Sequence, residues 1–177
     1  MYKMIRTGLG YDFHRLKKGR RFILGGVHIP FPKGELGHSD GDVLAHAVTD
    51  AILGACGLGD IGELFPAFEP AWKDADSMKL LHDVYKKVRQ TGWRLVNLDC
   101  VIVCENPKVL PYRNVIRNSI AQTLNVSPKN IFVKGKTSEG LGPVGKGKAV
   151  EVFAQCLLKK CLISRLNFLW DKHDKKD

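Results

Sequence analysis

The chain has 177 residues, of which 44% are hydrophobic and 26% charged, and this balance predicts one soluble, folded domain. No apolar run approaches the ~20 residues that cross a bilayer, and the opening residues MYKMIRTGLGYDF lack the apolar segment of a secretory signal. We therefore expect a cytoplasmic protein. Five cysteines, none of them in a Cys-x-x-Cys pair, argue against a disulfide framework and a four-cysteine zinc site.

The formal net charge of +10 is compatible with binding to nucleic acid, with a phosphorylated small substrate and with simple solubility. Part of the excess lies late in the chain, where residues 159–177 hold six Lys or Arg and three Asp. No internal repeat or linker interrupts the remainder. We therefore expect one domain over residues 1–160 and a basic C-terminal extension over residues 161–177.

The first part of the chain, residues 2–16, predicts a strand, a glycine turn and a second strand. Asp12 and His14 are two residues apart, so their side chains lie on one face of an extended segment. Gly8-Leu9-Gly10 is only part of a dinucleotide-binding motif, because Phe13 stands where the third glycine belongs. Residues 21–30 predict a hairpin, and residues 31–37 a loop.

The stretch over residues 38–62, HSDGDVLAHAVTDAILGACGLGDIG, predicts a helix between two polar turns. Asp40 or Asp42 can cap its start, and a glycine can end it. His46 lies off the apolar stripe of this helix, flanked by acidic residues one turn away on each side. An imidazole in this setting is a candidate metal ligand or base, provided that other residues join it. The stripe consists of Val43, Leu44, Ala47, Val48, Ala51 and Ile52.

The second half of the chain alternates between helices and strands. Residues 65–76 predict a loop long enough to act as a lid. The patterns that follow predict, in chain order, a helix from Ser77 to Gly92, a strand at 95–103, a helix from Pro111 to Leu124, and strands at 131–134 and 149–157.

A glycine-rich segment at 136–148 nearly matches a phosphate-binding P-loop, with the spacing Gly140-x4-Gly145-Lys146. The match fails at Gly147, where a Ser or Thr should stand. The segment is then either a hairpin with solvated lysines or a cradle for anions.

The order of these elements predicts an α/β (α+β) fold. We expect a single domain with a mixed four-stranded sheet, helices packed on one face, and a small hairpin. The bare face of the sheet would need cover, which a partner subunit could provide.

Asp12, His14 and His46 together offer one carboxylate and two imidazoles. This set suits Zn²⁺ and leaves a fourth position open for substrate. Glu139 could hold Mg²⁺ against phosphate oxygens. Several hydroxyl and lysine side chains could also bind phosphate: Ser39, Lys108, Lys136, Thr137, Ser138 and Lys146. The metal ligands and these side chains together favour either phosphoryl transfer or phosphate hydrolysis, and they do not distinguish the two reactions.

Several segments resemble the 2-C-methyl-D-erythritol 2,4-cyclodiphosphate synthase family, in unbroken order over about residues 5–157. His38-Ser39-Asp40-Gly41-Asp42, followed by His46, is the most specific of them. The others are Gly10-Tyr11-Asp12-Phe13-His14, Leu24-Gly25-Gly26-Val27-His28-Ile29-Pro30, Gly59-Asp60-Ile61-Gly62-Glu63-Leu64-Phe65-Pro66, Pro107-Lys108 and Thr137-Ser138-Glu139-Gly140-Leu141-Gly142.

The resemblance implies a homotrimer with active sites between subunits and a reaction of the non-mevalonate isoprenoid pathway. The substrate would be 4-diphosphocytidyl-2-C-methyl-D-erythritol 2-phosphate. Its 2-phosphate attacks the β-phosphorus of the diphosphate, and CMP leaves. The implied cofactors are one divalent cation per subunit, for which Zn²⁺ is expected, and Mg²⁺ or Mn²⁺ with the substrate diphosphate. Neither a membrane nor a nucleic-acid partner is expected.

The resemblance also implies roles for individual residues. Asp12, His14 and His46 would bind Zn²⁺, and Glu139 would help to place Mg²⁺. His38 and Thr137 would stabilise the transition state. The remaining residues would bind substrate, either its methylerythritol and ribose parts or its cytidine; they are Ser39, Asp60, Ile61, Gly62, Cys104, Glu105, Asn106, Pro107, Lys108, Val109, Leu110, Lys136, Ser138 and Lys146.

The chain departs from the family pattern at Ala67, Lys136, Pro143, Lys146 and Lys148. Ala67 falls in the expected lid, and the last three would lie near a trimer axis. Two other functions remain open at this point. A zinc-dependent phosphohydrolase could use the same three metal ligands, and a basic module could bind nucleic acid through its charge, although the basic residues are dispersed without interleaved aromatics.

Overall fold

The computed structural model describes residues 4–161. The predicted C-terminal extension therefore lies outside the described residues, apart from Cys161. The strands and helices are β1 (Ile5–Lys18), β2 (Phe22–Leu24), β3 (Val27–Ile29), β4 (Lys33–Leu36), α1 (Val43–Cys56), α2 (Ile61–Leu64), α3 (Ser77–Gln90), β5 (Trp93–Val103), α4 (Arg113–Thr123), β6 (Ile131–Lys136), α5 (Gly142–Gly145) and β7 (Ala149–Lys160), with single 3₁₀ turns at Pro70–Trp72, Leu110–Tyr112 and Pro128–Asn130.

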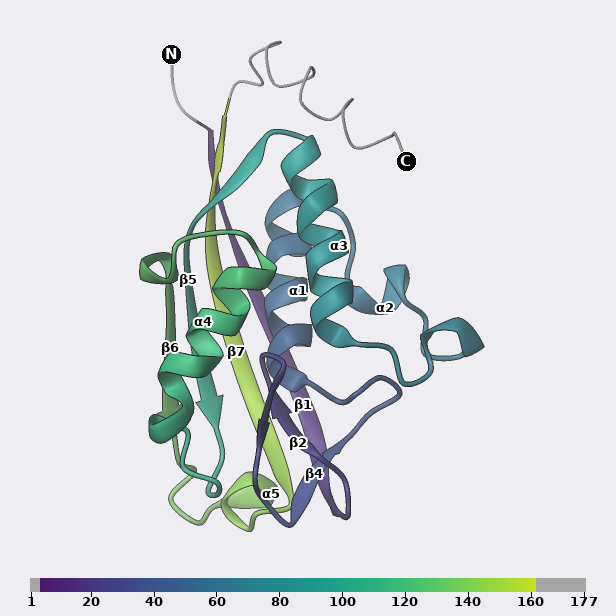
Figure 1. Ribbon diagram of the computed structural model, residues 1–177, viewed down its shortest axis with the longest axis vertical. Helices are drawn as coiled ribbons and strands as arrows, with labels where there is room; N and C mark the ends of the chain where they lie inside the picture. Colours follow the sequence, from purple (N-terminus) through teal and green to yellow (C-terminus); the bar gives the residue numbers. More distant parts are fainter. Residues whose placement is uncertain (1–3, 162–177) are drawn as a thin grey trace, which may run out of the picture.

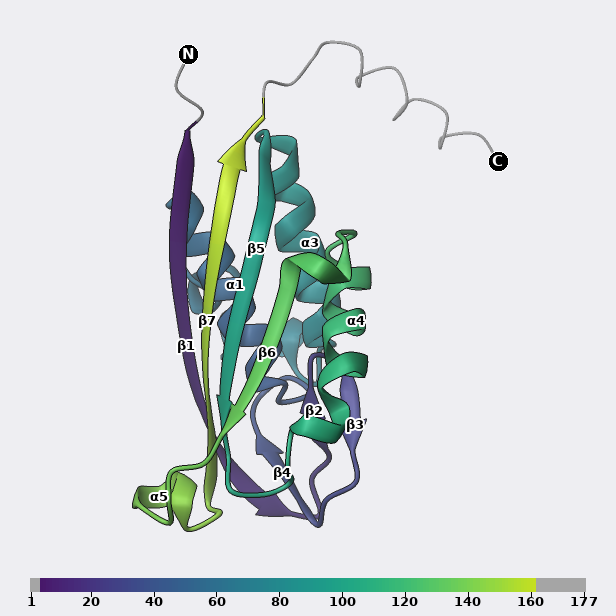
Figure 2. The ribbon, with the colours of Figure 1, turned by 90° about the vertical axis from the view of Figure 1, so that its left-hand side faces the viewer.

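The main sheet is mixed and has five strands in the order β4-β1-β7-β5-β6. Only β5 and β6 run parallel, because the α4 crossover joins them. Helices α1, α3 and α4 cover one face of this sheet, as the two views in Figure 1 and Figure 2 show. The predicted α+β domain with helices on one face is confirmed, and so is the hairpin, which is the β2–β3 pair.

The prediction of four strands was wrong by one strand. The segment expected as a loop over residues 31–37 contains β4, which pairs antiparallel with the end of β1. Arg15 lies opposite Leu36, and Lys18 lies opposite Lys33. Four residues flanked by Pro32 and Gly37 give too short a pattern to be told from a loop, and the pairing depends on a partner about 18 residues earlier in the chain.

The predicted glycine turn in residues 2–16 was also wrong, because β1 is one continuous strand. Gly8 and Gly10 instead allow α1 to approach the strand closely. A Cβ at Gly8 would lie 1.9 Å from the carbonyl oxygen of Ala51, and a Cβ at Gly10 would lie 1.9 Å from that of Ala47. The two glycines therefore set the distance between the strand that carries Asp12 and the helix that carries His46.

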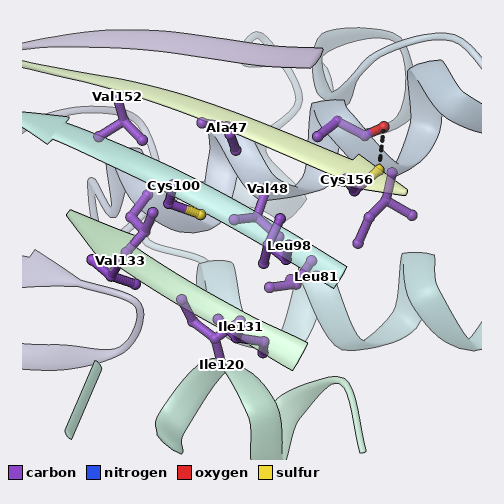
Figure 3. Close-up of a cluster of buried hydrophobic side chains, with 14 of the residues drawn as sticks. Ala47, Val48, Leu81, Leu98, Cys100, Ile120, Ile131, Val133, Val152 and Cys156 are labelled. Atoms are coloured by element: carbon purple, nitrogen blue, oxygen red, sulfur yellow. Dashed lines mark hydrogen bonds between the residues drawn. The ribbon is translucent and has the colours of Figure 1, made fainter. Parts of the chain in front are cut away.

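A single hydrophobic core fills the space between the sheet and the helices (Figure 3). Val48 of α1, Leu81 of α3 and Ile120 of α4 meet the inward-facing residues of the strands, such as Cys100 and Val152. Helix α3 begins at Ser77 as predicted, capped by Asp76, and the strand at β7 is confirmed. No described helix is long and apolar enough to pass through a bilayer.

Asp42 joins the start of α1 to the β2–β3 hairpin. It is fully buried, and its Oδ1 accepts hydrogen bonds from the backbone N–H groups of Leu44 and Ala45, which caps the helix. The same carboxylate accepts from the N–H groups of Gly25 at 2.9 Å and Gly26 at 2.6 Å. One buried carboxyl group thus accepts hydrogen bonds from four backbone donors and fixes the first turn of α1 in place.

Glu35 of β4 is a second fully buried carboxyl group, but only half of it is satisfied. Its Oε2 accepts from the N–H of Ile23 at 3.0 Å, whereas its Oε1 has no hydrogen-bond partner in residues 4–161. Burial raises the pKa of Glu35 from 4.5 to about 8, and the nearby Asp42 and Asp40 add to this effect. The carboxyl group therefore carries a proton at neutral pH.

We expect Glu35→Gln to make the free energy of unfolding less dependent on pH. Because the folded pKa is raised, the native protein is most stable below pH 4.5 with respect to this group, and the contribution is lost as the pH rises toward 8. The loss is about 1.4 kcal/mol per pH unit across that window. Urea unfolding at pH 5 and pH 8 measures the difference between the two proteins. Equal pH slopes would contradict the burial of a proton at Glu35.

Candidate metal centre

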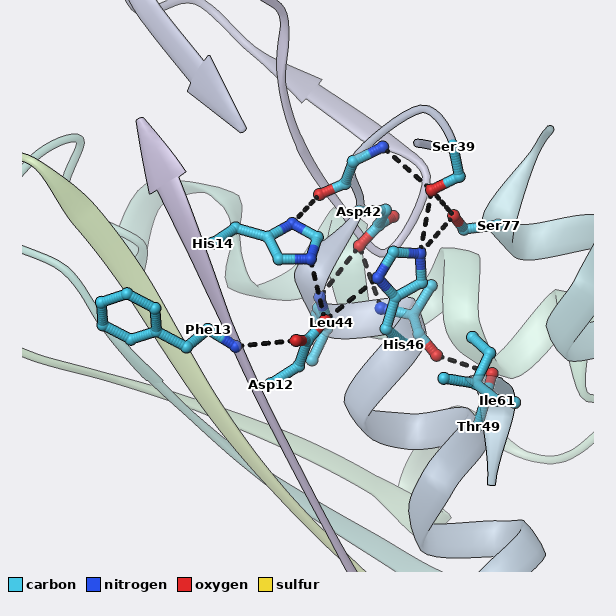
Figure 4. A network of polar contacts seen from close by, with 12 residues as sticks. Asp12, Phe13, His14, Ser39, Asp42, Leu44, His46, Thr49, Ile61 and Ser77 are labelled. Carbon is cyan, nitrogen blue, oxygen red and sulfur yellow. Dashed lines mark hydrogen bonds and ion pairs between the residues drawn. The ribbon is translucent and has the colours of Figure 1, made fainter. Parts of the chain in front are cut away.

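Two elements bring the predicted metal ligands together. Asp12 and His14 project from one face of β1, and His46 projects from the first turn of α1, which packs on that face (Figure 4). One potential ligand atom from each residue lies within 4.8 Å of the other two. Oδ2 of Asp12 is 3.1 Å from Nε2 of His14 and 3.0 Å from Nδ1 of His46. The predicted convergence of these three residues is confirmed.

The outer nitrogen of each imidazole is held by other groups. Nδ1 of His14 is 2.8 Å from the carbonyl oxygen of Gly41, which can only accept, so this nitrogen carries a proton. Nε2 of His46 contacts the hydroxyls of Ser39 at 3.0 Å and Ser77 at 2.9 Å. Nε2 of His14 is therefore free to point a lone pair at a metal ion, and Nδ1 of His46 faces the same point, an arrangement typical of metal-bound histidine.

The carboxylate of Asp12 is oriented in the same way. Its Oδ1 accepts the backbone N–H of Phe13 at 2.8 Å, which leaves Oδ2 facing the two imidazoles. Three lone-pair donors thus meet at one point, where they repel one another unless a cation or a proton lies between them. The donor set of one oxygen and two nitrogens fits a divalent metal ion of the zinc type.

Electrostatics within the cluster favour the charged forms of Asp12 and His14. Burial would raise the pKa of Asp12, but hydrogen bonds and charges from His14 and His46 outweigh it and hold that pKa far below its usual value. Burial would lower the pKa of His14, but Asp12 raises it above its ordinary value. A proton and a metal ion therefore compete for the same position, as expected for a metal site.

Two predicted substrate residues, Ser39 and Ile61, lie close to the metal ligands (Figure 4). Ser39 contacts His46, as described, and Ile61 is held to α1 because its N–H donates to Oδ1 of Asp50 at 2.8 Å. Asp60 caps α2 and precedes Ile61 and Gly62. His38 lines a cavity of about 450 Å³, together with part of the predicted lid. The lining residues are Arg20, Gly37, His38, Ala67, Phe68, Glu69, Pro70, Lys73 and Asp74.

The other predicted site residues form a second group at the ends of β5 and β6. Oε1 of Glu105 accepts from the N–H of Ser138 at 2.8 Å, and the N–H of Cys104 donates to the carbonyl oxygen of Lys136 at 3.0 Å. Thr137 donates to Glu139 at 2.6 Å. The backbone of Asn106, Pro107, Lys108, Val109 and Leu110 leads from β5 toward the turn before α4, and Lys146 ends the single turn of α5.

The two groups do not meet within one chain. Sheet register places Phe13, Glu151, Val103 and Lys136 in one row across β1, β7, β5 and β6. Three strand spacings separate the ends of that row, a distance of about 14 Å. Glu139, predicted as a metal ligand, is accordingly outside the cluster formed by Asp12, His14 and His46.

Three residues that support predicted site residues were not identified from the sequence. Gly41, Asp50 and Ser77 each hold a predicted site residue in place, yet none was assigned that role. Gly41 lies in the polar turn before α1 and could have been suspected from that position. Ser77 is 31 residues from His46, and its place at a helix start gives no sign of the contact.

Comparisons with known proteins show the family to which the chain belongs. A family model described as the YgbB family matches residues 5–159. The 2-C-methyl-D-erythritol 2,4-cyclodiphosphate synthase of Treponema denticola is 57% identical over 154 residues, which cover 87% of this chain and 96% of the relative. The protein of the same name from Carboxydothermus hydrogenoformans is 50% identical over 159 residues, covering 90% and 98%.

Solved structures show the same fold. A structure of 2C-methyl-D-erythritol-2,4-cyclodiphosphate synthase in a form bound to CDP has a TM-score of 0.80 at 40% identity, covering 86% of this chain and 99% of that one. A CDP complex of IspF from Plasmodium falciparum has a TM-score of 0.79 at 37% identity, covering 90% and 99%. The chain therefore belongs to the YgbB family, and its relatives are 2-C-methyl-D-erythritol 2,4-cyclodiphosphate synthases.

Proposed function

We propose that the protein converts 4-diphosphocytidyl-2-C-methyl-D-erythritol 2-phosphate to 2-C-methyl-D-erythritol 2,4-cyclodiphosphate and CMP. The convergence of Asp12, His14 and His46, in a chain 57% identical to a relative named for this activity, carries the proposal. An oxygen of the 2-phosphate forms a bond to the β-phosphorus, the bond from that phosphorus to the bridging oxygen breaks, and CMP leaves with this oxygen. No group on the protein is needed as nucleophile.

Asp12, His14 and His46 would hold one divalent ion. We propose zinc, because the site offers two nitrogen donors and one oxygen donor. When bound, the ion would supply positive charge to the phosphate oxygens as a Lewis acid. The chain contributes the orientation of this site. Gly41 fixes the ring of His14, and the N–H of Phe13 directs one oxygen of Asp12 away from the ion.

The remaining residues would fold the substrate so that its two phosphate groups meet. Nucleophile and leaving group belong to one molecule, so holding them in line replaces a collision between separate reactants. His38, beside the 450 Å³ cavity, and Thr137 would stabilise charge that develops on the transferred phosphoryl group. Glu139 would help to place Mg²⁺ or Mn²⁺ between the phosphates.

We further propose that three copies assemble and that each active site combines both groups of residues. The helix-free face of the sheet exposes large apolar side chains, including Leu9 at 69%, Ile5 at 63%, Tyr11 at 49% and Phe132 at 44%. Such a face favours burial against another subunit. A neighbouring copy would also bring the loops at Cys104 and Thr137 to the metal ligands that lie far from them in one chain. The mass in solution, measured by light scattering, tests the assembly.

Products formed in ¹⁸O-labelled water would test the reaction. Intramolecular cyclisation should give the cyclic diphosphate and CMP in equal amounts, with no labelled oxygen in either, because no water is consumed. A phosphohydrolase would give linear products that carry one labelled oxygen per bond cleaved. Labelled linear phosphate as the main product would replace the proposed cyclisation with hydrolysis.

A further inference from the structure

Ser77 connects His46 to a carboxylate that has no other role in the centre. Its Oγ is 2.9 Å from Nε2 of His46 and 2.5 Å from Oδ1 of Asp40. Ser77 is 1% exposed, so water does not compete for these contacts. The short distance to Asp40 is typical of a hydrogen bond to an ionised group.

The number of protons available fixes the direction of these hydrogen bonds. A serine hydroxyl has one proton, and an ionised carboxylate can only accept, so Ser77 donates to Asp40. The oxygen of Ser77 must then accept from Nε2 of His46. Nε2 therefore carries the proton of the imidazole, and Nδ1 keeps the lone pair that faces Oδ2 of Asp12.

Backbone hydrogen bonds hold the segments that carry Ser77 and Asp40 next to each other. The N–H of Asp40 donates to the carbonyl oxygen of Ala75 at 3.1 Å, and the N–H of Asp74 donates to that of His38 at 2.8 Å. The N–H of Ser77 also donates to Oδ2 of Asp40 at 3.3 Å. The turn before α1 and the start of α3 thus form one unit behind His46, fixed by contacts that need no metal ion.

We propose that Ser77, backed by the charge of Asp40, is a positioning residue that fixes the tautomer and the ring orientation of His46 for metal binding. The inference rests on the proposed metal centre. Ser39 also reaches Nε2 of His46, at 3.0 Å, and lies 3.2 Å from Oγ of Ser77, but no carboxylate in residues 4–161 accepts a hydrogen bond from its hydroxyl. Loss of Ser77 leaves Nε2 of His46 with Ser39 alone, so the ring is held less firmly and can adopt the tautomer that carries its proton on the inner nitrogen, Nδ1.

Zn²⁺ affinity, measured by competition with a chelating dye, tests the proposal without substrate. Ser77→Ala should weaken Zn²⁺ binding by about 10–100-fold, the usual effect of losing the partner of a metal-bound histidine. Co²⁺ bound to the variant should show altered visible absorption, because the ligand geometry changes. Ser77→Thr keeps the hydroxyl and should restore most of the affinity.

Asp76→Ala provides the matched control. Asp76 neighbours Ser77 and caps α3 through the N–H groups of Met78 and Lys79, but it forms no hydrogen bond with His46. This variant should lower the melting temperature and leave Zn²⁺ affinity unchanged. A fall in affinity equal to that of Ser77→Ala would mean that loosening the helix start is the cause, and would overturn the proposal.

Two further outcomes separate the possible failures. Unchanged Zn²⁺ affinity and an unchanged Co²⁺ spectrum in Ser77→Ala would reject the role of Ser77 while leaving the metal centre intact. An unaltered protein that binds neither ion would reject the metal centre itself, and this inference with it. Should Ser77→Ala fail to fold, Asp40→Asn decides the matter, since removal of the backing charge should weaken Zn²⁺ binding several-fold and wild-type affinity would contradict the proposal.

Discussion

His46→Ala is expected to abolish binding of the divalent ion and to lower kcat by at least about 10³-fold, with the fold retained. His46 supplies one of three converging donors, and two donors on one strand cannot hold the ion in a closed geometry. The fold should persist because α1 is anchored by its apolar stripe and by Asp42, neither of which involves the imidazole. Metal content by atomic absorption, activity and circular dichroism measure the three effects.

His28→Ala is the control for this variant, since His28 is an exposed histidine of β3 outside the metal cluster. It should keep metal content and activity at wild-type values. Turnover at the wild-type rate in a metal-free His46→Ala protein would show that the three-residue cluster has no part in the reaction.

Gly10→Ala is expected to destabilise the protein by at least about 3 kcal/mol. The new Cβ would lie 1.9 Å from the carbonyl oxygen of Ala47 and 2.7 Å from the N–H nitrogen of Ala51, both of them backbone atoms of α1. Neither can rotate away, so the helix must move off the strand. The same movement would separate His46 from Asp12 and His14, and any folded fraction should bind metal weakly. Urea unfolding and metal titration measure the two effects.

Gly54→Ala serves as the matched substitution on the partner helix. Gly54 lies on the exposed side of α1, where an added Cβ meets nothing within 4 Å. Alanine there should raise stability by about 0.5–1 kcal/mol, because it restricts the unfolded chain and favours the helix. A comparable loss of stability from both substitutions would mean that close approach of strand and helix is not the reason for Gly10.

The metal cluster could be predicted from sequence because each of its parts has a local signature. Asp12 and His14 alternate along an extended segment, and His46 sits on a helix whose cap and apolar stripe are both visible. The resemblance to a known family then joined segments that local patterns leave separate. The main helices and the order of most elements followed from the same kind of short-range pattern.

The features that sequence analysis missed depend on contacts between distant residues. In the sequence, Gly8 and Gly10 look like a turn. The structure shows that their lack of a Cβ lets α1 pack closely against β1. Strand β4 exists because β1 is long enough to pair with it. Ser77 meets His46 only after α1 and α3 have packed together. None of these contacts produces a periodic pattern in the amino-acid sequence.

The row that places Phe13 and Lys136 at opposite ends of the sheet has a kinetic consequence. If catalysis requires loops from one copy beside the ions of another, the specific activity becomes a function of protein concentration. Dilution below the dissociation constant of the assembly would then abolish the activity, although each chain would remain folded with its metal ion bound. A small molecule that bound between the copies and prevented their assembly would then inhibit the reaction without resembling the substrate.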